Sequence, residues 1–374
     1  MRAALLLPLF LLLLAPAVTA LGAELPRLYV DTTFPTMTGS VITVPTTSDV
    51  AANGLALQSA IDAAQPGDTI VLQAGSTYRG GISLPKKTGT GWIVIRTSAI
   101  DQLPPEGTRV NPSHASLMPR IVSPGFNVPT LQNSNGAGYY RIVGIELTVP
   151  SNITYIHNTV VFLHTDSASI TDVPHHFVLD RLYIHGHDGV HMQRCVTGNA
   201  AHLAVIDSYL SKCHASGFDS QAFGVWNGPG PFKVNNNFLE GAGENVIFGG
   251  ADPSIQGLIP SDVEMRGNHL YKNPAWRSPN GTNAYTVKNL FETKSVQRLL
   301  FEGNVLEYSW PHGQVGFGFV IISVDQGGTC PWCVSQDLTF RSNIMRMAAS
   351  GANIAGYSYG PNPVQRVLFE NNLF

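Results

Sequence analysis

Charged side chains are scarce in this sequence. Asp, Glu, Lys and Arg make up 13% of the 374 residues, whereas an average globular protein contains roughly 25%. The net charge is −3, so composition offers no basic surface for nucleic acid or for an anionic membrane. After the leucine-rich N-terminal run, no segment is long and apolar enough to span a bilayer. These features argue against a nucleic-acid-binding protein and against a membrane-spanning one.

Cysteine is also rare, with four residues in the whole chain. Cys330 and Cys333 form a CxxC motif, but no βαβ pattern surrounds it, so a thioredoxin-like redox site is not favoured. We interpret the motif as a disulfide that closes a loop. A zinc site would require Cys195 and Cys213 to lie beside it, and we discount that arrangement. The pairing of Cys195 and Cys213 stays open.

The first 23 residues have the features of a secretory signal peptide. Arg2 precedes a leucine-rich run that is too short to cross a bilayer, and small residues at 18–20 and 21–23 offer cleavage sites. We therefore expect a secreted or periplasmic protein, in which disulfides are permitted.

One short phrase recurs along the second half of the chain. It reads LLFEGNVL at 299–306, and each copy is an apolar strand, a small or polar turn and a second short strand. The copies place these residues in one slot: Asn237, Asn268, Asn304, Asn343 and Asn372, with weaker copies at Ile145, Leu182 and Ser208. Successive slots from Leu182 onward are 26 to 39 residues apart. Repeats of this period indicate stacked units.

Strand repeats without intervening helices predict an all-β fold, a single-stranded right-handed parallel β-helix. At a tight corner, Asn tolerates left-handed dihedrals and bonds its own backbone. In coils stacked about 4.8 Å apart, such side chains can bond up and down the stack. We interpret the asparagine slot as scaffold.

Three regions are expected along the chain. Residues 1–23 are the signal peptide, 24–54 an extended N-terminal segment and 55–374 the β-helix. The sequence stops within a repeat and no polar cap follows, so we expect further C-terminal coils.

A helical pattern over 55–64 precedes the first strands. The phrase AIDAAQPGDTIVLQAGSTY at 60–78 resembles the N-terminal cap and first coil of the pectin-lyase-like superfamily. The resemblance implies that the helix closes the open end of the stack, where strand edges would otherwise be exposed. It also implies that a substrate groove lies over the outward face of one sheet.

Five segments are the candidate strands of that sheet. They are Gly189–Arg194, Asp219–Gly224, Asn245–Gly249, Leu290–Lys294 and Phe319–Val324. Because side chains alternate along a strand, inward Phe291 and Thr293 would leave Glu292 and Lys294 pointing outward together. Arg298 would follow at the next corner.

The pair Lys294-Ser295, followed by a repeat strand, is similar to the lysine motif of chondroitinase B and alginate lyases. The resemblance implies a lysine acting as Brønsted base and calcium masking a uronate carboxylate. This chain departs from the motif, because Asn289 replaces the calcium-binding carboxylate and only His312 and Gln314 stand near the place of the basic partner. Calcium is therefore a weakly supported cofactor.

The leading hypothesis is a polysaccharide lyase that acts on an acidic polymer, as a monomer, by β-elimination. Lys294 would be the base, Arg298 or Lys288 would neutralise the carboxylate, and Glu292 and Glu244 would orient the sugar or bind a cation. Further substrate-binding candidates are the polar and aromatic residues Lys288, Asp219, Gln221, Asn245, Trp226 and Trp310.

Two other classes remain open. Glycine-rich stretches carry Glu240, Glu244 and Asp252, which would suit a glycoside hydrolase if two of them come together. A non-catalytic glycan-binding or cell-surface structural protein is the other alternative, because fold does not fix function. The spacing of His185, His187 and His191 suggests a metal site. We do not favour one, because the three residues span a corner of the coil and their rings are expected to diverge.

Overall fold

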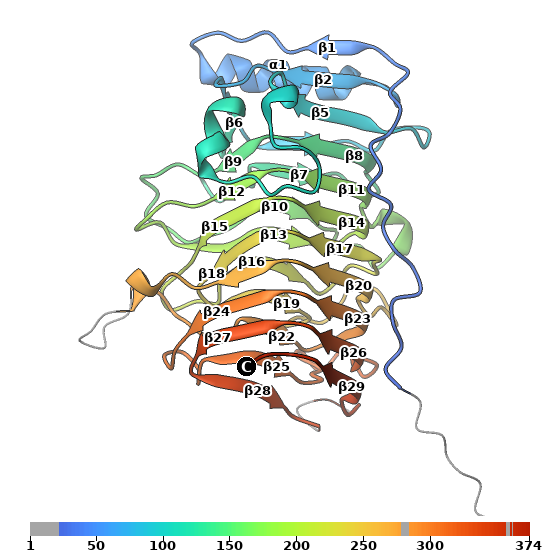
Figure 1. Cartoon of the computed structure of the whole chain (residues 1–374). Helices are drawn as coiled ribbons and strands as arrows, with labels where there is room; N and C mark the ends of the chain where they lie inside the picture. Colours follow the sequence, from blue (N-terminus) through green and yellow to red (C-terminus); the bar gives the residue numbers. More distant parts are fainter. Residues whose placement is uncertain (1–21, 278–283, 357–359, 361) are drawn as a thin grey trace, which may run out of the picture.

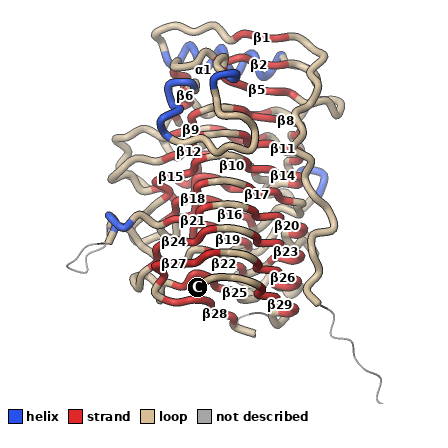
Figure 2. Tube along the Cα trace, viewed as in Figure 1, coloured by secondary structure: helices blue, strands red, loops and turns tan. Residues whose placement is uncertain are grey.

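The computed structural model describes residues 22–277, 284–356, 360 and 362–374. Here the backbone winds into stacked coils, and the strands of successive coils form three sheets (Figure 1). Neighbouring strands pair in parallel, each coil with the next. Figure 2 shows the strands lying in columns with loops between them. The predicted right-handed parallel β-helix with an N-terminal helix is confirmed.

Sheet 1 has eleven strands, and sheets 2 and 3 have nine each. Sheet 1 contains β1 Val41–Thr43, β2 Thr69–Leu72, β5 Ile93–Thr97, β8 Gly138–Val143, β11 His175–Asp180, β14 Ala201–Ile206, β17 Phe232–Asn235, β20 Ser261–Arg266, β23 Val296–Glu302, β26 Ser335–Arg341 and β29 Gln365–Glu370. Sheet 2 contains β3 Thr77–Arg79, β6 Arg120–Val122, β9 Glu146–Thr148, β12 Tyr183–His185, β15 Tyr209–Cys213, β18 Phe238–Gly241, β21 His269–Tyr271, β24 Val305–Ser309 and β27 Ile344–Ala348. Sheet 3 contains β4 Ile82–Leu84, β7 Leu131–Asn133, β10 His157–Leu163, β13 Met192–Gly198, β16 Gln221–Val225, β19 Glu244–Phe248, β22 Phe291–Thr293, β25 Phe317–Ile321 and β28 Ser350–Ile354.

The core is a continuous column inside the coils. In sheet 3 the inward residues stay in register from coil to coil, so that Val246 pairs with Phe291 and Phe291 with Phe319. Rings from sheet 1, such as Phe301 and Phe340, pack against them. All five side chains are fully buried. The five strands predicted for the groove sheet are all strands of sheet 3, and their predicted bounds differ from the observed ones by up to a few residues.

The asparagine slot forms a hydrogen-bonded ladder at the corner between sheets 1 and 2. The Oδ1 of Asn304 accepts from both the backbone N and the Nδ2 of Asn268, at 2.9 Å each. Asn304 in turn donates from Nδ2 to the carbonyl of Met265 one coil earlier, 3.0 Å away. The same pattern joins the other members of the ladder, which are Asn237, Asn268, Asn343 and Asn372. Ser208 extends it, since Oγ accepts from the amide of Leu182. The predicted column is confirmed.

The reason given for asparagine at this slot needs a correction. The residue with left-handed dihedrals is the one before the slot: Gly303 has φ 65°, Asn236 has φ 55° and Ser342 has φ 56°. The side-chain amide of the slot asparagine forms hydrogen bonds with buried backbone groups that the turn would otherwise leave without partners.

The N-terminal helix α1 spans Val50–Ala63, so it begins before the predicted residue 55. Asp49 caps it, because its carboxylate accepts from the amides of Ala51 and Ala52. Leu57 and Ile61 are buried in the core at the first coil, as expected for a helix that closes the stack.

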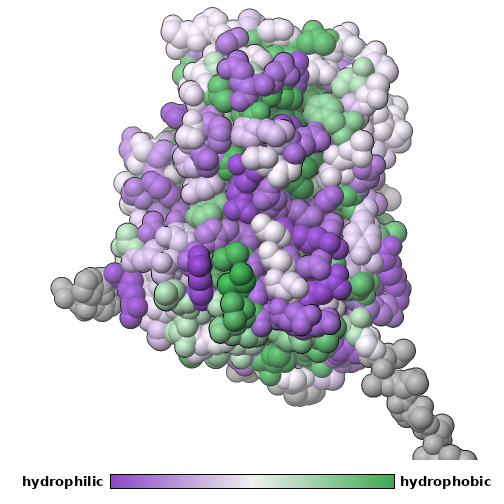
Figure 3. Space-filling model, viewed as in Figure 1, coloured by the Kyte–Doolittle hydropathy of each residue, from purple (hydrophilic) through white to green (hydrophobic). Residues whose placement is uncertain are grey.

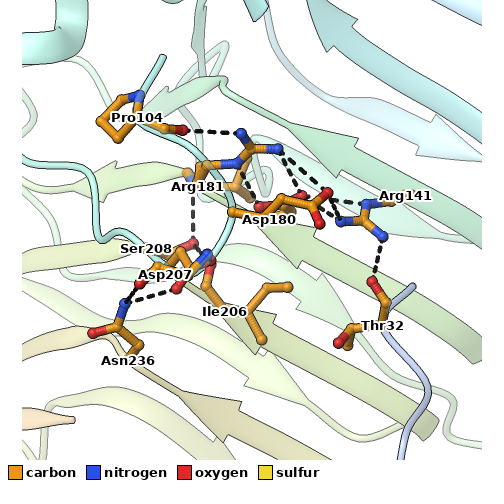
Figure 4. Close-up of polar contacts among 12 residues, drawn as sticks. Thr32, Pro104, Arg141, Asp180, Arg181, Ile206, Asp207, Ser208 and Asn236 are labelled. Carbon is orange, nitrogen blue, oxygen red and sulfur yellow. Dashed lines mark hydrogen bonds and ion pairs between the residues drawn. The ribbon is translucent and has the colours of Figure 1, made fainter. Parts of the chain in front are cut away.

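The segment before β1 lies along the outer side of sheet 1 (Figure 1). Its backbone is bound at several coils: the amide of Arg27 donates to Asp262 Oδ1 at 2.9 Å, and Arg141 Nη1 donates to the carbonyl of Thr32 at 2.7 Å. Figure 4 shows Arg141 between Thr32 and Asp180, whose Oδ2 it contacts at 2.7 Å. The predicted extended segment is thus an ordered strap over sheet 1 from residue 22 onward; residues 1–21 of the predicted signal peptide lie outside the described residues.

Both cysteine pairs form disulfides, Cys330 with Cys333 and Cys195 with Cys213. The disulfide interpretation of the CxxC motif is confirmed, and the open pairing is settled. Two disulfides fit an oxidising compartment outside the cytoplasm. Among the described residues, no helix has the length and hydropathy needed to cross a membrane.

Replacing Asn304 by alanine should destabilise the fold by about 1–3 kcal/mol, because Asn268 and Met265 lose buried hydrogen bonds. Chemical denaturation monitored by circular dichroism measures this loss. Asn152→Ala is the matched control, since Asn152 is exposed. Equal midpoints for the two variants would contradict the scaffold role.

Candidate functional site

Glu292 and Lys294 lie together on the outer face of sheet 3. Phe291 and Thr293 point into the core, and Lys294 Nζ lies 3.5 Å from Glu292 Oε1. The predicted orientation is confirmed. Both side chains line a cleft of about 700 Å³ whose walls come from the next coils: Gln314, Val315, Phe317, Val320, Ile322, Val324, Asp325, Gln326, Asn353 and Ala355.

The carboxyl group of Glu292 is held in an unusual environment. Its residue is 2% exposed, and burial, together with the negative charge of Glu244, raises the pKa of Glu292 to about 7. Lys294 and a hydrogen bond from Asn289 Nδ2 to Oε2, at 2.7 Å, act in the opposite direction. A carboxyl group of this kind exchanges protons near neutral pH.

Asn289 links Glu292 to the next coil. Its Nδ2 also donates to Gln314 Oε1 at 2.6 Å. At the position where the lyase motif has a calcium-binding carboxylate, this chain therefore has an amide that donates to Glu292. Among the described residues, no group of three or more His, Cys, Asp or Glu side chains is arranged to hold a metal ion.

A second polar group lies on the preceding strands of sheet 3 and on the loops that lead into its strands. Lys288 Nζ contacts Asp219 Oδ1 and lies 3.5 Å from Glu244 Oε1. Burial disfavours a charged lysine, but Glu244 and Asp219 outweigh it and raise the pKa of Lys288. Gln221 Nε2 donates to Glu244 Oε2 at 2.7 Å. The structure thus joins four of the predicted site residues in one cluster near Glu292: Asp219, Gln221, Glu244 and Lys288.

The turn that leads into Glu244 rests on a buried lysine. Lys272 Nζ donates to the carbonyls of Gly241, Ala242 and Gly243 at 2.6 to 2.9 Å. Complete burial lowers the pKa of Lys272 to about 7. Sequence reasoning missed Lys272, because a lysine after a repeat strand gives no sign that it turns inward.

Arg194, on β13, was also missed. Its guanidinium carbon lies 4.9 Å from the centre of the Trp226 ring. Arg194 is in register with Gln221, and Gln221 with Glu244, so it belongs to the same outward column. Aligning the coils in this register would have identified Arg194 from the sequence. That alignment requires each coil boundary to be known with single-residue accuracy.

Several predicted residues are elsewhere. Arg298 is on sheet 1, where its Nε donates to Asp262 Oδ1 at 2.7 Å beneath the N-terminal strap; its predicted role beside Lys294 is wrong. Asn245 points inward and donates to the carbonyls of Leu239 and Tyr271, so it does not face a groove. Trp310 is 5% exposed in a satellite core and is not a stacking platform.

The carboxylates proposed for a hydrolase do not all come together. Burial raises the pKa of Glu240, which accepts the amide of Lys212 on the sheet 2 side. Asp252 ties two loops by accepting the amides of Gln326, Gly327 and Thr329. Of the three candidates, Glu244 is the one on the outer face of sheet 3.

The three histidines of the corner have different hydrogen-bond partners. His185 Nε2 contacts Glu146 Oε1 at 2.9 Å, whereas His187 Nε2 contacts the carbonyl of Val149. His191 Nδ1 accepts the amide of Ser216 instead. The expectation that all three rings diverge is wrong for His185 and His187, whose ring centroids lie 5.3 Å apart.

The loop that carries Lys288 is anchored by a buried histidine. The His214 ring stacks on Tyr285 with centroids 3.6 Å apart and meets Trp276 edge-on. Neither ring nitrogen of His214 has a hydrogen-bond partner among the described residues, and burial lowers the pKa of His214 to about 4.

The face seen in Figure 3 carries both hydrophilic and hydrophobic side chains: hydrophilic groups gather over the middle coils, and an apolar strip lies beside them in the lower half.

No family model matches the chain, and no curated protein sequence matches it either. Solved structures do resemble it. Alginate lyase from Paenibacillus sp. str. FPU-7 is 16% identical with a TM-score of 0.48, over 89% of this chain and 99% of that one.

Two further structures are similar. The catalytic unit of GH87 alpha-1,3-glucanase from Streptomyces thermodiastaticus is 13% identical with a TM-score of 0.49, over 91% of this chain and 52% of the other. Pectate lyase Pel9A is 14% identical with a TM-score of 0.46, over 87% and 81%. The β-helix fold of this chain is established by its own three parallel sheets. Likeness at this level carries no information about activity.

Acid should weaken the fold through His214. Its folded-state pKa, about 4, lies below the ordinary value of 6.5, so the unfolded chain binds the extra proton first. The contribution of His214 to stability is complete above about pH 6.5 and is lost as pH drops toward 4, by on the order of 3 kcal/mol. Denaturation midpoints measured across this range should fall less in His214→Phe, which keeps the ring. An identical pH dependence in both proteins would contradict this account.

Proposed function

We propose that this protein is a polysaccharide lyase that cleaves an acidic polysaccharide by β-elimination at the cleft over sheet 3. The observation that supports it is the pair Glu292–Lys294, a carboxyl group with a pKa near 7 beside an amine 3.5 Å away. β-Elimination needs such a base and such a cation in one cleft.

The roles differ from those expected from the lysine motif. As the partner of an ion pair, Lys294 supplies positive charge, and Glu292 has the pKa that a base needs at neutral pH. Glu292 takes the proton from the carbon next to the uronate carboxyl group. The bond to the glycosidic oxygen then breaks as a C=C double bond forms, and the departing oxygen takes up the proton that Glu292 now carries. Lys294 stabilises the negative charge that develops on the carboxyl group.

The surrounding groups fix this pair. Asn289 donates to Glu292, and Gln326 Oε1 accepts from Lys294 at 3.2 Å. Asn289 lies on the same coil as Glu292 and Gln326 on the next one, so the reacting groups are held before substrate binds.

A second candidate is a glycoside hydrolase. It is favoured by the nearness of Glu244 to Glu292, whose pKa burial and the charge of Glu244 raise to about 7, because a carboxyl group with a raised pKa beside a second carboxyl group is the usual pair of such enzymes. In that reaction protonated Glu292 would donate to the leaving oxygen, and Glu244 would act as the carboxylate.

Glu292→Gln and Lys294→Ala should each reduce turnover by about 100-fold or more, since each removes one member of the pair. Purified protein is incubated with alginate, pectate and chondroitin, with and without calcium, and unsaturated products are followed by absorbance. Melting temperatures should not fall, because burial already disfavours the ionised Glu292 and a partly exposed lysine contributes little. Arg346→Gln, on sheet 2 and paired with Glu307, is the control. Full activity in both site variants would refute the assignment.

The pH dependence separates the two chemistries. If Glu292 is the base, kcat/KM should rise with pH and level off above a midpoint near 7, because the deprotonated form is active. If Glu292 is an acid, the rate should fall above that midpoint, and reducing ends should appear without unsaturated absorbance. Absence of any product from all three polymers would favour a non-catalytic glycan-binding protein.

A further inference from the structure

Arg194 is a partly buried arginine whose Nε has no hydrogen-bond partner. This nitrogen is itself buried, and it donates to no described residue. A guanidinium carries five N–H donors in a planar fork. Buried polar groups normally have partners, and an uncompensated charge is costly to bury. Such a group points to a ligand that supplies the acceptors.

The position of Arg194 is built rather than accidental. Gly224 leaves room for it, because a Cβ at residue 224 would lie 3.2 Å from Arg194 Nε. Trp226 supports the guanidinium from one side, at 4.9 Å. Trp226 is itself fixed, since its amide donates to Asn199 Oδ1 at 2.8 Å and its ring lies 5.5 Å from that of His164.

The nearest carboxylates are already engaged. Asp219 and Glu244 are close enough to act on Arg194 electrostatically, yet both are contacted by Lys288. Gln221 also donates to Glu244. Lys288 therefore pairs with both carboxylates, whereas the Nε of Arg194 keeps a hydrogen-bond donor without an acceptor.

We propose that Arg194 and Trp226 form a binding subsite for a uronic acid unit, in which the guanidinium fork holds the carboxylate and the half-buried indole packs against the sugar. This subsite rests on the proposed function and extends it. An arginine fork matches a carboxylate in geometry and charge. An indole supplies apolar area beside it.

The subsite lies on the same outer face as the cleft. β13, β16, β19 and β22 are successive neighbours in sheet 3, so Arg194 and Glu292 are three strand steps apart, or roughly 14 Å along the stack. Glu292 is in register with Ile247 and Arg194, through Gln221, with Glu244, so a polymer that crosses these strands obliquely would reach both. Short oligomers that fill only the cleft would not touch Arg194.

Binding, measured apart from turnover, tests the proposal. In the Glu292→Gln background, calorimetry compares long and short oligouronates with neutral oligosaccharides. Arg194→Gln should weaken binding of long oligouronates roughly tenfold or more, because a charged hydrogen bond is lost, and leave short and neutral oligomers unchanged. The affinity of Arg194→Lys for long oligouronates should lie between those of the parent and Arg194→Gln, since lysine keeps the charge but lacks the planar fork of donors. Arg346→Gln should bind like the parent.

The outcomes separate the two proposals. Unchanged affinity for long oligouronates in a folded Arg194→Gln, or in Arg194→Lys if the first does not fold, overturns the subsite, whatever the wild-type turnover. Arg194-dependent binding without turnover of any polymer supports the subsite and refutes the lyase. Arg194-dependent binding of dextran sulfate in preference to oligouronates overturns the carboxylate assignment. No binding of any acidic oligomer overturns both.

Discussion

From Asn237 onward, each coil of this protein turns from sheet 1 to sheet 2 at an asparagine, which is buried in every coil except the last. The side-chain oxygen takes two hydrogen bonds from the asparagine of the coil before, and the side-chain nitrogen reaches a carbonyl on that same coil. Because these bonds run along the stack, they fix the height and rotation of one coil on the next. The parallel register of all three sheets, and so every outward column, depends on that alignment.

The candidate site follows from this alignment. Glu244 and Glu292 are far apart in sequence, but their strands are neighbours in sheet 3, and the charge of one raises the pKa of the other. Lys272 and His214 hold the turn and the loop that carry Glu244 and Lys288. Several groups that are costly to bury, among them Glu244, Glu292 and Lys272, thus lie at or near the outer face of sheet 3, and perturbed pKa values of this kind are frequent at functional sites.

Sheet 1 shows the opposite use of charge. Arg298 pairs with Asp262, and Arg366 with Asp337 at 2.7 Å, while the amides of Arg27 and Glu24 bind the same two aspartates. These pairs hold the N-terminal strap in place. The sequence-based placement of Arg298 beside Lys294 failed because a four-residue separation in sequence crosses a corner here, and the two side chains leave on different sheets.

Local pattern in the sequence determined the repeat, the asparagine column, the capping helix and the outward direction of Glu292 and Lys294. The alternation of side chains along a strand and the residue preferences of turns depend on a few neighbouring residues, so the sequence alone reveals them. Only the tertiary structure decided which columns meet: Asn245 and Trp310 are buried, whereas Arg194 lies over Trp226 with no hydrogen-bond partner for its Nε. The loops between strands differ in length from coil to coil, so register across coils, and with it the composition of the site, is set by stacking and not by spacing along the chain.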